Sequence, residues 1–324
     1  MEEALYHPEH GYYASGRCSI GRKGDYFTNV SVGPLFGQLL ALQFSEIWEH
    51  LETNDFVIVE QGAHDGQFAQ DVLEFVQNRL PEFFDALRYQ IIERFPILKE
   101  QQRRKVEAFG DKVSWPDSPA PFVGVHFSNE LLDAMPVRLI DDGMEKLVGL
   151  DGDKLVFVER PVKKTVFNQA ALDCIDQIAA NLRRGYVIAI DYGVLDEEFE
   201  GSVQARAQHR HLNSPFEQIG DADITMKVHW KSIIERAREN GLSMAGFADQ
   251  HHFLTGIISQ FGSSDRNQSQ LLHDSPKAKR ELQTLLHPEM LGRAFQVVAL
   301  AKNVGSDTES LAGFKFAPQP GQGG

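Results

Sequence analysis

The feature that most limits the fold of this chain is a regular alternation of short apolar runs with longer amphipathic segments. The amphipathic segments have the apolar spacing of helices, and the apolar runs have the length of buried strands. Such alternation favours a parallel sheet with helices on both faces, so we predict an α/β fold. The predicted strands are 56–59, 89–92, 122–127, 186–190, 295–300 and one beginning at Leu242; the predicted helices are 35–51, 67–79, 96–108, 171–182, 231–240 and one beginning at Leu131.

The alternation divides the chain into a core and insertions within one domain, 1–324. Asp-Gly turn signals predict a small antiparallel insertion over 141–168, and the polar segments 194–240 and 249–292 are typical of a lid or a substrate-facing unit. The core sheet is expected from 51–140, 170–193 and 242–303. The segment 1–50 precedes the core, its first 35 residues are expected to be ordered loop, and 304–324 is expected to be a flexible tail.

Composition limits the kinds of partner and compartment that suit this protein. The formal net charge of −14 argues against nucleic acid, whose phosphates require a basic surface. No apolar run is long enough to span a membrane, and the acidic start lacks the features of a secretory signal. Cys18 and Cys174 form no metal or disulfide pattern, which favours a reducing compartment such as the cytoplasm. The spacing of the histidines at 209, 211, 251 and 252 does not favour metal binding.

The strongest local motif is a glycine turn after the first predicted strand. The sequence from Val57 continues Ile-Val-Glu60-Gln-Gly62-Ala-His64-Asp65-Gly66 and then enters a predicted helix. Glycine lets the backbone bend sharply and lets a ligand approach closely. A dinucleotide-binding turn requires Gly-x-Gly-x-x-Gly, and His64 occupies the place of its middle glycine. The motif is typical of the turn beneath S-adenosylmethionine, although a simple strand-to-helix turn would look the same.

Glu93 follows the second predicted strand, at the same expected edge of the sheet. A carboxylate there can accept hydrogen bonds from both hydroxyls of a ribose. Nicotinamide enzymes use an acid in the same place, so Glu93 indicates a nucleoside ligand more than a methyl donor. A solvated acid at a strand end is the alternative.

A polar cluster follows the third predicted strand, in the sequence Ser128-Asn129-Glu130-Leu-Leu-Asp133. If a helix begins here, Glu130 and Asp133 lie on one face of it. Ser128 or Asn129 is also a suitable N-cap, so the acids could serve the helix alone. Ser128 has no Gly-x-Ser-x-Gly context, which disfavours a hydrolase. Asp191-Tyr192-Gly193 ends another predicted strand and places a further acid near the same crevice.

These motifs together resemble the MidA-like family of S-adenosylmethionine-dependent methyltransferases, whose eukaryotic mitochondrial members assist assembly of respiratory complex I. The matching segments run in family order over nearly the whole chain. They are 3–13 (Glu-Ala-Leu-Tyr-His-Pro-Glu-His-Gly-Tyr-Tyr), 24–28 (Gly-Asp-Tyr-Phe-Thr), 35–37, 59–62 (Val-Glu-Gln-Gly), 129–136 (Asn-Glu-Leu-Leu-Asp-Ala-Met-Pro), 190–193 (Ile-Asp-Tyr-Gly) and 222–225 (Ala-Asp-Ile-Thr). Ala63-His64-Asp65 departs from the family, which often has Pro-Gly-Arg there.

The resemblance implies a Rossmann-like methyltransferase core with inserted helical and antiparallel elements, and S-adenosylmethionine as the cofactor. It implies that Gly62 and its neighbours hold the methionine part and Glu93 the ribose. It also implies that the N-terminal segment 1–50 covers the cofactor, with 24–28 closing over it. The cofactor-binding set is then Gly24, Asp25, Thr28, Glu60, Gly62, His64, Asp65, Gly66, Glu93 and Ser128. Asn129, Glu130 and Asp133 are implied to face the transferred methyl group as catalytic residues.

The implied activity is methylation of arginine on a protein. A guanidinium is a poor nucleophile while charged, and paired carboxylates can orient it and take its proton. The resemblance implies a complex I subunit as the acceptor and, in a eukaryote, the mitochondrial matrix as the compartment. A homodimer is left open. The alternative is an assembly or scaffold protein that keeps the fold and binds the cofactor without catalysis.

Overall fold

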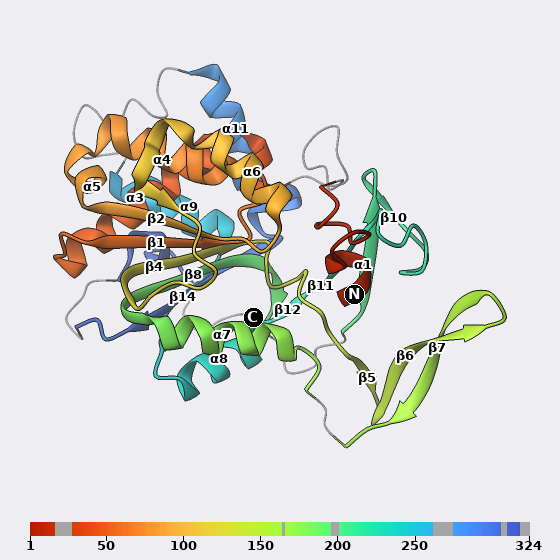
Figure 1. Ribbon diagram of the computed structural model, residues 1–324. Coiled ribbons are helices and arrows are strands. Elements are labelled where there is room, and N and C mark those ends of the chain that lie inside the picture. The colour runs from red at the N-terminus through yellow and green to blue at the C-terminus, as the bar shows by residue number, and fades with distance from the viewer. Residues whose placement is uncertain (17–27, 164–165, 196–200, 262–274, 306–309, 318–324) are drawn as a thin grey trace.

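The computed structural model describes residues 1–16, 28–163, 166–195, 201–261, 275–305 and 310–317. A twisted sheet forms the centre of the molecule (Figure 1). Its strands are β1 Phe56–Gln61, β2 Leu87–Ile92, β3 Val113–Ser114, β4 Phe122–Asn129, β8 Leu182–Val194, β12 Val228–His229, β13 Ser243–Asp249 and β14 Phe295–Lys302. Their order is β13-β14-β8-β4-β1-β2-β3, with β12 beside β8. The strand β14 is antiparallel to both of its neighbours, β8 and β13, and the other pairs described in this sheet are parallel.

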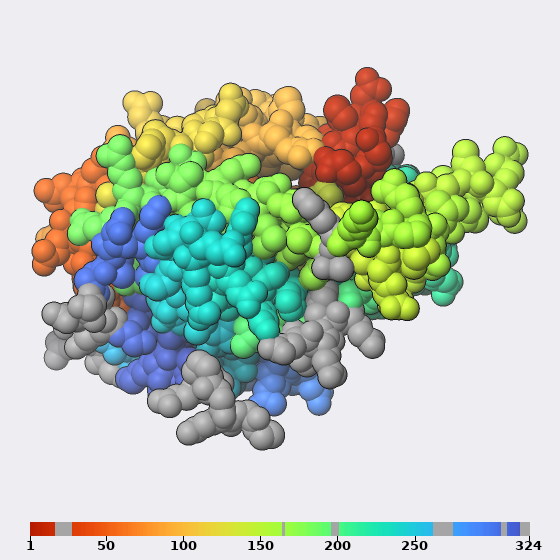
Figure 2. Space-filling view, turned by 90° about the horizontal axis from the view of Figure 1, so that it is seen from below, coloured from red at the N-terminus to blue at the C-terminus, as the bar shows by residue number. Residues whose placement is uncertain are grey.

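Helices cover both faces of the sheet, as predicted. The layer above it in Figure 1 contains α3 Leu35–Leu51, α4 Gln67–Arg79, α5 Pro81–Ala86, α6 Pro96–Lys105, α9 Gln250–Phe261 and α11 Pro276–Leu286. The layer below contains α7 Gln169–Asn181 and α8 Trp230–Glu239, which lie side by side in Figure 2. Because side chains alternate along a strand, β1 sends Phe56 and Ile58 into one core and Val57 and Val59 into the other.

The helix α3 has the bounds that its apolar spacing predicts. Its buried face includes Leu39, Leu40, Phe44 and Ile47, none more than 2% exposed. Burying one such side chain contributes about 1.5–3 kcal/mol, so this face anchors the helix against β4 and β8. Short helical turns complete the fold: η1 Glu107–Lys112, η2 Pro288–Gly292 and η3 Ala312–Phe314.

Two small antiparallel sheets lie outside the core. The first consists of β5 Leu139–Asp141, β6 Met144–Asp151 and β7 Lys154–Pro161, and it projects from the body as an arm (Figures 1 and 2). The antiparallel insertion predicted at 141–168 is therefore present. The second consists of β9 Val203–Ala207, β10 Arg210–His211 and β11 Asp223–Met226. It packs against α1, Glu2–Tyr6, through an apolar cluster that includes Leu5 and Ile224.

Three expectations about local structure are wrong. The first 35 residues are not all loop, because they contain α1 and α2, Asn29–Val32. Within the segment 249–292, α9 belongs to the core instead of a lid, because Phe253, Leu254 and Ile257 pack into the upper layer; whether the rest of the segment faces a substrate stays a prediction. No helix begins at Leu131; residues 130–135 form bends and one turn.

Among the described residues, no helix has both the length and the apolar character needed to cross a bilayer.

Candidate functional site

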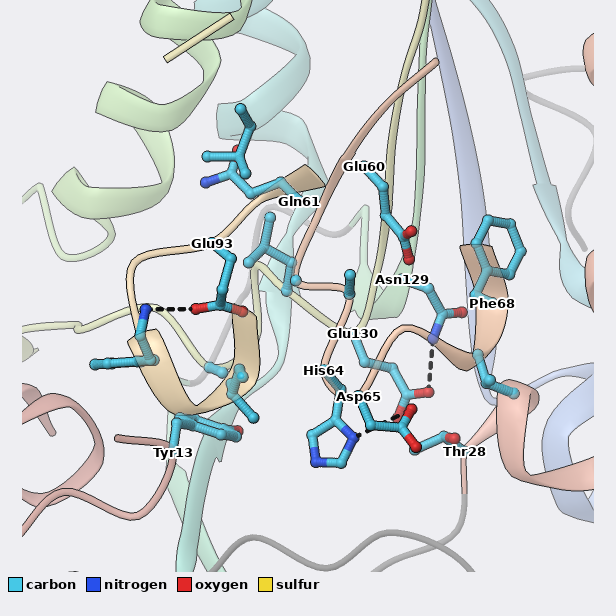
Figure 3. A pocket seen from close by; sticks show the side chains of 18 of the residues that line it. Tyr13, Thr28, Glu60, Gln61, His64, Asp65, Phe68, Glu93, Asn129 and Glu130 are labelled. Carbon is cyan, nitrogen blue, oxygen red and sulfur yellow. Dashed lines mark hydrogen bonds and ion pairs between the residues drawn. The ribbon is translucent and has the colours of Figure 1, made fainter. Parts of the chain in front are cut away.

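A cavity of about 330 Å³ lies where β1, β2 and β4 end (Figure 3). The chain leaves β1 toward α4 on the upper face and leaves β4 toward α7 on the lower face. Neighbouring parallel strands whose connections diverge in this way leave a crevice at their carboxyl ends, where ligands of α/β sheets bind. The cavity is closed on the other side by α1 and by residues 28–31, including Thr28.

The glycine turn forms one wall of this cavity, and its backbone explains its sequence. Gly62, His64 and Gly66 have positive φ angles of 84°, 46° and 85°, a conformation that glycine tolerates best and histidine better than bulky residues. The Asp65 carboxylate accepts from the Gln67 N–H at 3.1 Å at the start of α4. Gly62, His64 and Asp65 border the cavity, whereas Gly66 does not; a side chain at Gly66 would press on Gln102 at 3.2 Å.

Asp65 is also held by Lys105, whose Nζ donates to Oδ2 at 2.7 Å. Burial alone would raise the pKa of Asp65, but hydrogen bonds from His64 and Lys105 keep that pKa below its ordinary value. The carboxylate therefore stays charged and keeps the turn and α4 together.

Gln102 connects the glycine turn to Glu93, and sequence reasoning missed it. Its side chain is fully buried; Nε2 donates to the His64 carbonyl at 2.8 Å and to Glu93 Oε2 at 3.1 Å, and Oε1 accepts from Trp115 Nε1 at 2.9 Å. The only signal in the sequence is a glutamine on the buried side of a predicted helix.

Glu93 lies one residue beyond β2 and borders the cavity, as its position in the sequence predicts. Oε1 accepts from the Phe95 N–H at 2.9 Å, and burial raises the pKa of the carboxyl group. Two ionised oxygens offer about four acceptor sites, so the bonds to Phe95 and Gln102 leave acceptor capacity for a ligand. Figure 3 shows the carboxyl group at the cavity wall.

Glu60 also borders the cavity, but it is held from within the sheet. Tyr89 Oη donates to Oε2 at 2.7 Å. Burial raises the pKa of Glu60 to about 8, against the lowering effect of that hydrogen bond.

Aromatic side chains supply much of the remaining wall, and none of them was predicted as a site residue. They are Tyr6, Tyr13, Phe68 and Phe95. Tyr6 and Phe95 lie nearly parallel, with ring centroids 6.4 Å apart. A flat aromatic wall beside a buried acid suits a nucleoside, which has a ring to stack and hydroxyls to bind.

A second cavity of about 140 Å³ adjoins the first, since Tyr13 and Glu130 line both. Three carboxyl groups border it, those of Glu130, Asp133 and Asp223. Tyr13 Oη donates to Asp223 Oδ1 at 2.7 Å, which joins the N-terminal segment to β11. Asp223 belongs to a segment that matched the family, but sequence reasoning gave it no role.

Glu130 occupies the boundary between the two cavities. It adopts a φ of 55°, and Asn129 Nδ2 donates to its Oε1 at 2.9 Å. Asn29 Nδ2 donates in turn to Asn129 Oδ1 at 3.0 Å. Burial, opposed by the bond from Asn129, raises the pKa of Glu130 to about 8, and the charges of Asp191 and Asp223 add to the effect.

Asp191 explains why residues 130–135 do not form a helix. Its Oδ2 accepts from the N–H groups of residues 131, 132 and 133 at 3.1, 2.8 and 3.3 Å, and Oδ1 accepts from the Tyr192 N–H at 2.8 Å. Burial raises the pKa of Asp191 to about 7, although the four bonds lower it. Burial, with the charges of Asp191, Asp223 and Glu130, holds the pKa of Asp133 well above its ordinary value.

The other predicted site residues are placed as follows. Thr28 borders the first cavity and caps α2, its Oγ1 accepting from the Ser31 N–H at 3.2 Å. Ser128 is buried in β4 beside Gln61 and borders neither cavity, because its strand position points it into the sheet packing. Gly24 and Asp25 lie outside the described residues. Within the described part of the chain, no group of three or more His, Cys, Asp or Glu residues could hold a metal ion.

Fold and site together define a class of protein: an open α/β sheet with its ligand crevice at the ends of β1 and β4 and a cavity wall that suits a nucleoside. Residues 39–248 match the family described as "Putative S-adenosyl-L-methionine-dependent methyltransferase". The chain therefore belongs to this family of S-adenosylmethionine-dependent methyltransferases, as its motifs predicted, and the nicotinamide alternative is set aside.

Relatives and solved structures agree with this assignment. The chain is 23% identical to the Drosophila melanogaster protein arginine methyltransferase NDUFAF7 homolog, mitochondrial, over 94% of this chain and 80% of that protein. It is 24% identical to human NDUFAF7, mitochondrial, over 93% and 78%. A likely methyl transferase from Burkholderia thailandensis, whose crystal structure contains S-adenosyl-homocysteine, is 27% identical to this chain. The two structures superpose over 98% of this chain and 89% of that one, with a TM-score of 0.84.

The residues around the first cavity fit the cofactor of the family. The glycine turn offers close backbone approach, Glu93 offers unused acceptor capacity, and aromatic rings offer a stacking surface. The departure Ala63-His64-Asp65 leaves this arrangement intact, because His64 tolerates the turn and Asp65 caps α4.

Proposed function

We propose that this protein transfers the methyl group of S-adenosylmethionine to an arginine side chain of another protein. The observation that carries the proposal is the acid-lined second cavity, which joins the cofactor-sized cavity at Glu130. An acceptor in the second cavity would have Asp133 and Asp223 beside it and Glu130 at the junction with the first cavity. A guanidinium is the side chain best matched to several carboxylates, because its planar fork makes bidentate, charge-assisted bonds.

In this proposal the first cavity holds the methyl donor. The turn from Gly62 to Asp65 would bind its amino-acid part, Glu93 would accept from its ribose hydroxyls, and the aromatic wall would contact its base. The cofactor supplies a methyl group made reactive by a sulfonium charge. The residues of the chain hold and orient the two partners and exclude water, and positioning of this kind can account for much of the acceleration.

Glu130 would receive the proton that the acceptor nitrogen loses. Its raised pKa shows that the empty site disfavours the ionised carboxyl group. A bound guanidinium favours ionisation again, since an opposite charge within contact distance lowers the pKa of an acid. Asp133 and Asp223 would hold the guanidinium in place while Glu130 faces the methyl donor.

Methyl transfer from labelled S-adenosylmethionine into a bacterial or mitochondrial extract, followed by acid hydrolysis of the labelled proteins, tests this function. We expect the label in methylarginine. Label in methyl-lysine would contradict the arginine assignment, as would label lost as methanol during the hydrolysis, which is the fate of carboxyl methyl esters. Calorimetric binding of S-adenosylmethionine without transfer to any protein would support the scaffold alternative.

The predictions about the acceptor protein, the oligomeric state and the location rest on likeness to relatives. NDUFAF7 proteins are named as mitochondrial arginine methyltransferases, and by this likeness we propose a protein acceptor here too. A complex I subunit as that acceptor, a homodimer, and a cytoplasmic or matrix location remain predictions from the resemblance.

Glu93→Ala should weaken binding of S-adenosyl-homocysteine by about 1–3 kcal/mol, the usual cost of leaving polar partners unpaired. The measurement is isothermal titration calorimetry. Glu93→Gln is the matched control, because it keeps an acceptor for the Phe95 N–H and should lose less affinity for S-adenosyl-homocysteine. Unchanged affinity in Glu93→Ala would show that the ribose lies elsewhere.

The pH profile of transfer should rise toward alkaline pH. Glu130 accepts a proton only when ionised, and its pKa in the empty site is about 8. We therefore expect kcat/KM for the acceptor to increase about tenfold per pH unit below that value and to level off above it, because kcat/KM reports the free enzyme. A profile that is flat between pH 6 and 9 would exclude Glu130 as the proton acceptor.

A further inference from the structure

The floor of the second cavity is the polar face of the strands β9 and β11. In an antiparallel pair, alternate residues share a face, and the register places Asp223 opposite Arg206 and Thr225 opposite Gln204. The opposite face carries Ala205 and Ile224, which are buried in the cluster with α1. The polar residues that line the cavity from these strands and the position after β11 are Gln204, Arg206, Asp223, Thr225 and Lys227.

This face brings two cations into a cavity that we have so far described by its acids. Arg206 is half-buried and Lys227 is exposed, so Arg206 lies deeper and Lys227 lies at the rim. The charge of Arg206 acts on Tyr192, whose pKa it lowers against the raising effects of burial and of Glu130. The cavity is therefore lined by both acidic and basic side chains.

The guanidinium of Arg206 is incompletely satisfied by the described residues. Nη2 donates to Gln204 Oε1 at 3.2 Å, but Nε is buried and has no hydrogen-bond partner among them. Its cross-strand neighbour Asp223 accepts from Tyr13 Oη. A guanidinium has five N–H donors, so the single bond from Nη2 leaves the part of this side chain that lines the cavity with donors for a ligand.

We propose that Arg206 and Lys227 bind an acidic side chain of the acceptor protein, an aspartate or glutamate close to the arginine that is methylated. This inference rests on the proposed function and adds the sequence preference of the acceptor. A carboxylate matches the fork of an arginine in bidentate geometry, and a lysine adds a point charge. The acids of the cavity would receive the target guanidinium while the two cations receive its acidic neighbour.

The test is methyl transfer to peptide libraries that contain one fixed arginine and a single variable position within three residues of it. We expect the wild-type protein to favour Asp or Glu over Asn or Gln at one such position by about tenfold in kcat/KM, since a charge-assisted pair is worth that much or more. Arg206→Gln should abolish this preference and leave the rate with Asn or Gln peptides within about twofold. Arg206→Glu should favour a lysine neighbour.

Lys154→Gln, an exposed charge on the arm, is the matched control and should behave as the wild type. Calorimetry with S-adenosyl-homocysteine reports whether Arg206→Gln keeps the fold and the cofactor cavity. If Arg206→Gln slows acidic and neutral peptides equally, Arg206 only balances the charge of the acids, and the inference is wrong. Equal rates for acidic and neutral peptides with the wild type would also overturn it. Absence of methylarginine in every peptide would instead contradict the proposed function.

Discussion

Replacing Glu130 with glutamine is expected to lower kcat by about 10²- to 10⁴-fold, the range that a positioned general base contributes. The amide keeps the size of the side chain and an acceptor for the Asn129 amide group, but it cannot take a proton. Stopped time courses with labelled S-adenosylmethionine measure kcat, and calorimetry measures cofactor affinity, which should change little. Equal losses of kcat and cofactor affinity would place Glu130 in the cofactor site instead.

The effect of Glu130→Gln on stability separates a loss of catalysis from a folding defect. The folded-state pKa of Glu130 is raised from 4.5 to about 8, so the free energy of unfolding falls as pH rises between these values. Glutamine does not titrate, so Glu130→Gln should be at least as stable as the wild type at pH 8. A marked drop in its thermal midpoint at that pH would mean that the side chain serves the fold.

Asp191→Ala should have the second large effect, on stability and activity together. The substitution leaves four backbone N–H groups without their acceptor, and each unpaired buried donor costs about 1–3 kcal/mol. Relief of repulsion with Asp133 and rearrangement of the turn offset part of this cost. We therefore expect the free energy of unfolding to fall by about 2–4 kcal/mol. Urea unfolding measures it.

Asp191→Asn is the matched control, because it retains an acceptor and should lose less stability. It also removes a charge that raises the pKa of Glu130, so the rise in its pH–rate profile should move to lower pH. If Asp191→Ala unfolds at the same urea concentration as the wild type, the turn at residues 130–135 does not depend on this carboxylate.

Periodicity and the order of motifs predicted most of the core. The helix at 35–51 and the strand beginning at Phe56 follow from local patterns that tertiary packing reinforces. The helix expected at Leu131 does not form, because the partner that decides it is Asp191, sixty residues later in the chain. No local pattern carries that contact.

The site was predictable where its residues follow a strand. Glu93 and Glu130 lie at strand ends, and topology alone brings such residues to one edge of the sheet. Tyr13 and Asp223 were not predicted, because they meet only through the packing of α1 on the β9–β11 sheet, 210 positions apart in sequence. Ser128 shows the converse: it is next to the site in sequence, but β-strand alternation turns it away.

The most direct test is a crystal structure of the protein with S-adenosyl-homocysteine and an arginine-containing peptide. We expect the nucleoside in the cavity at the ends of β1 and β4, its ribose hydroxyls on Glu93, and the peptide guanidinium in the second cavity against Glu130. A nucleoside bound outside that cavity, or a guanidinium that reaches the ligand's sulfur without contacting Glu130, would contradict the account.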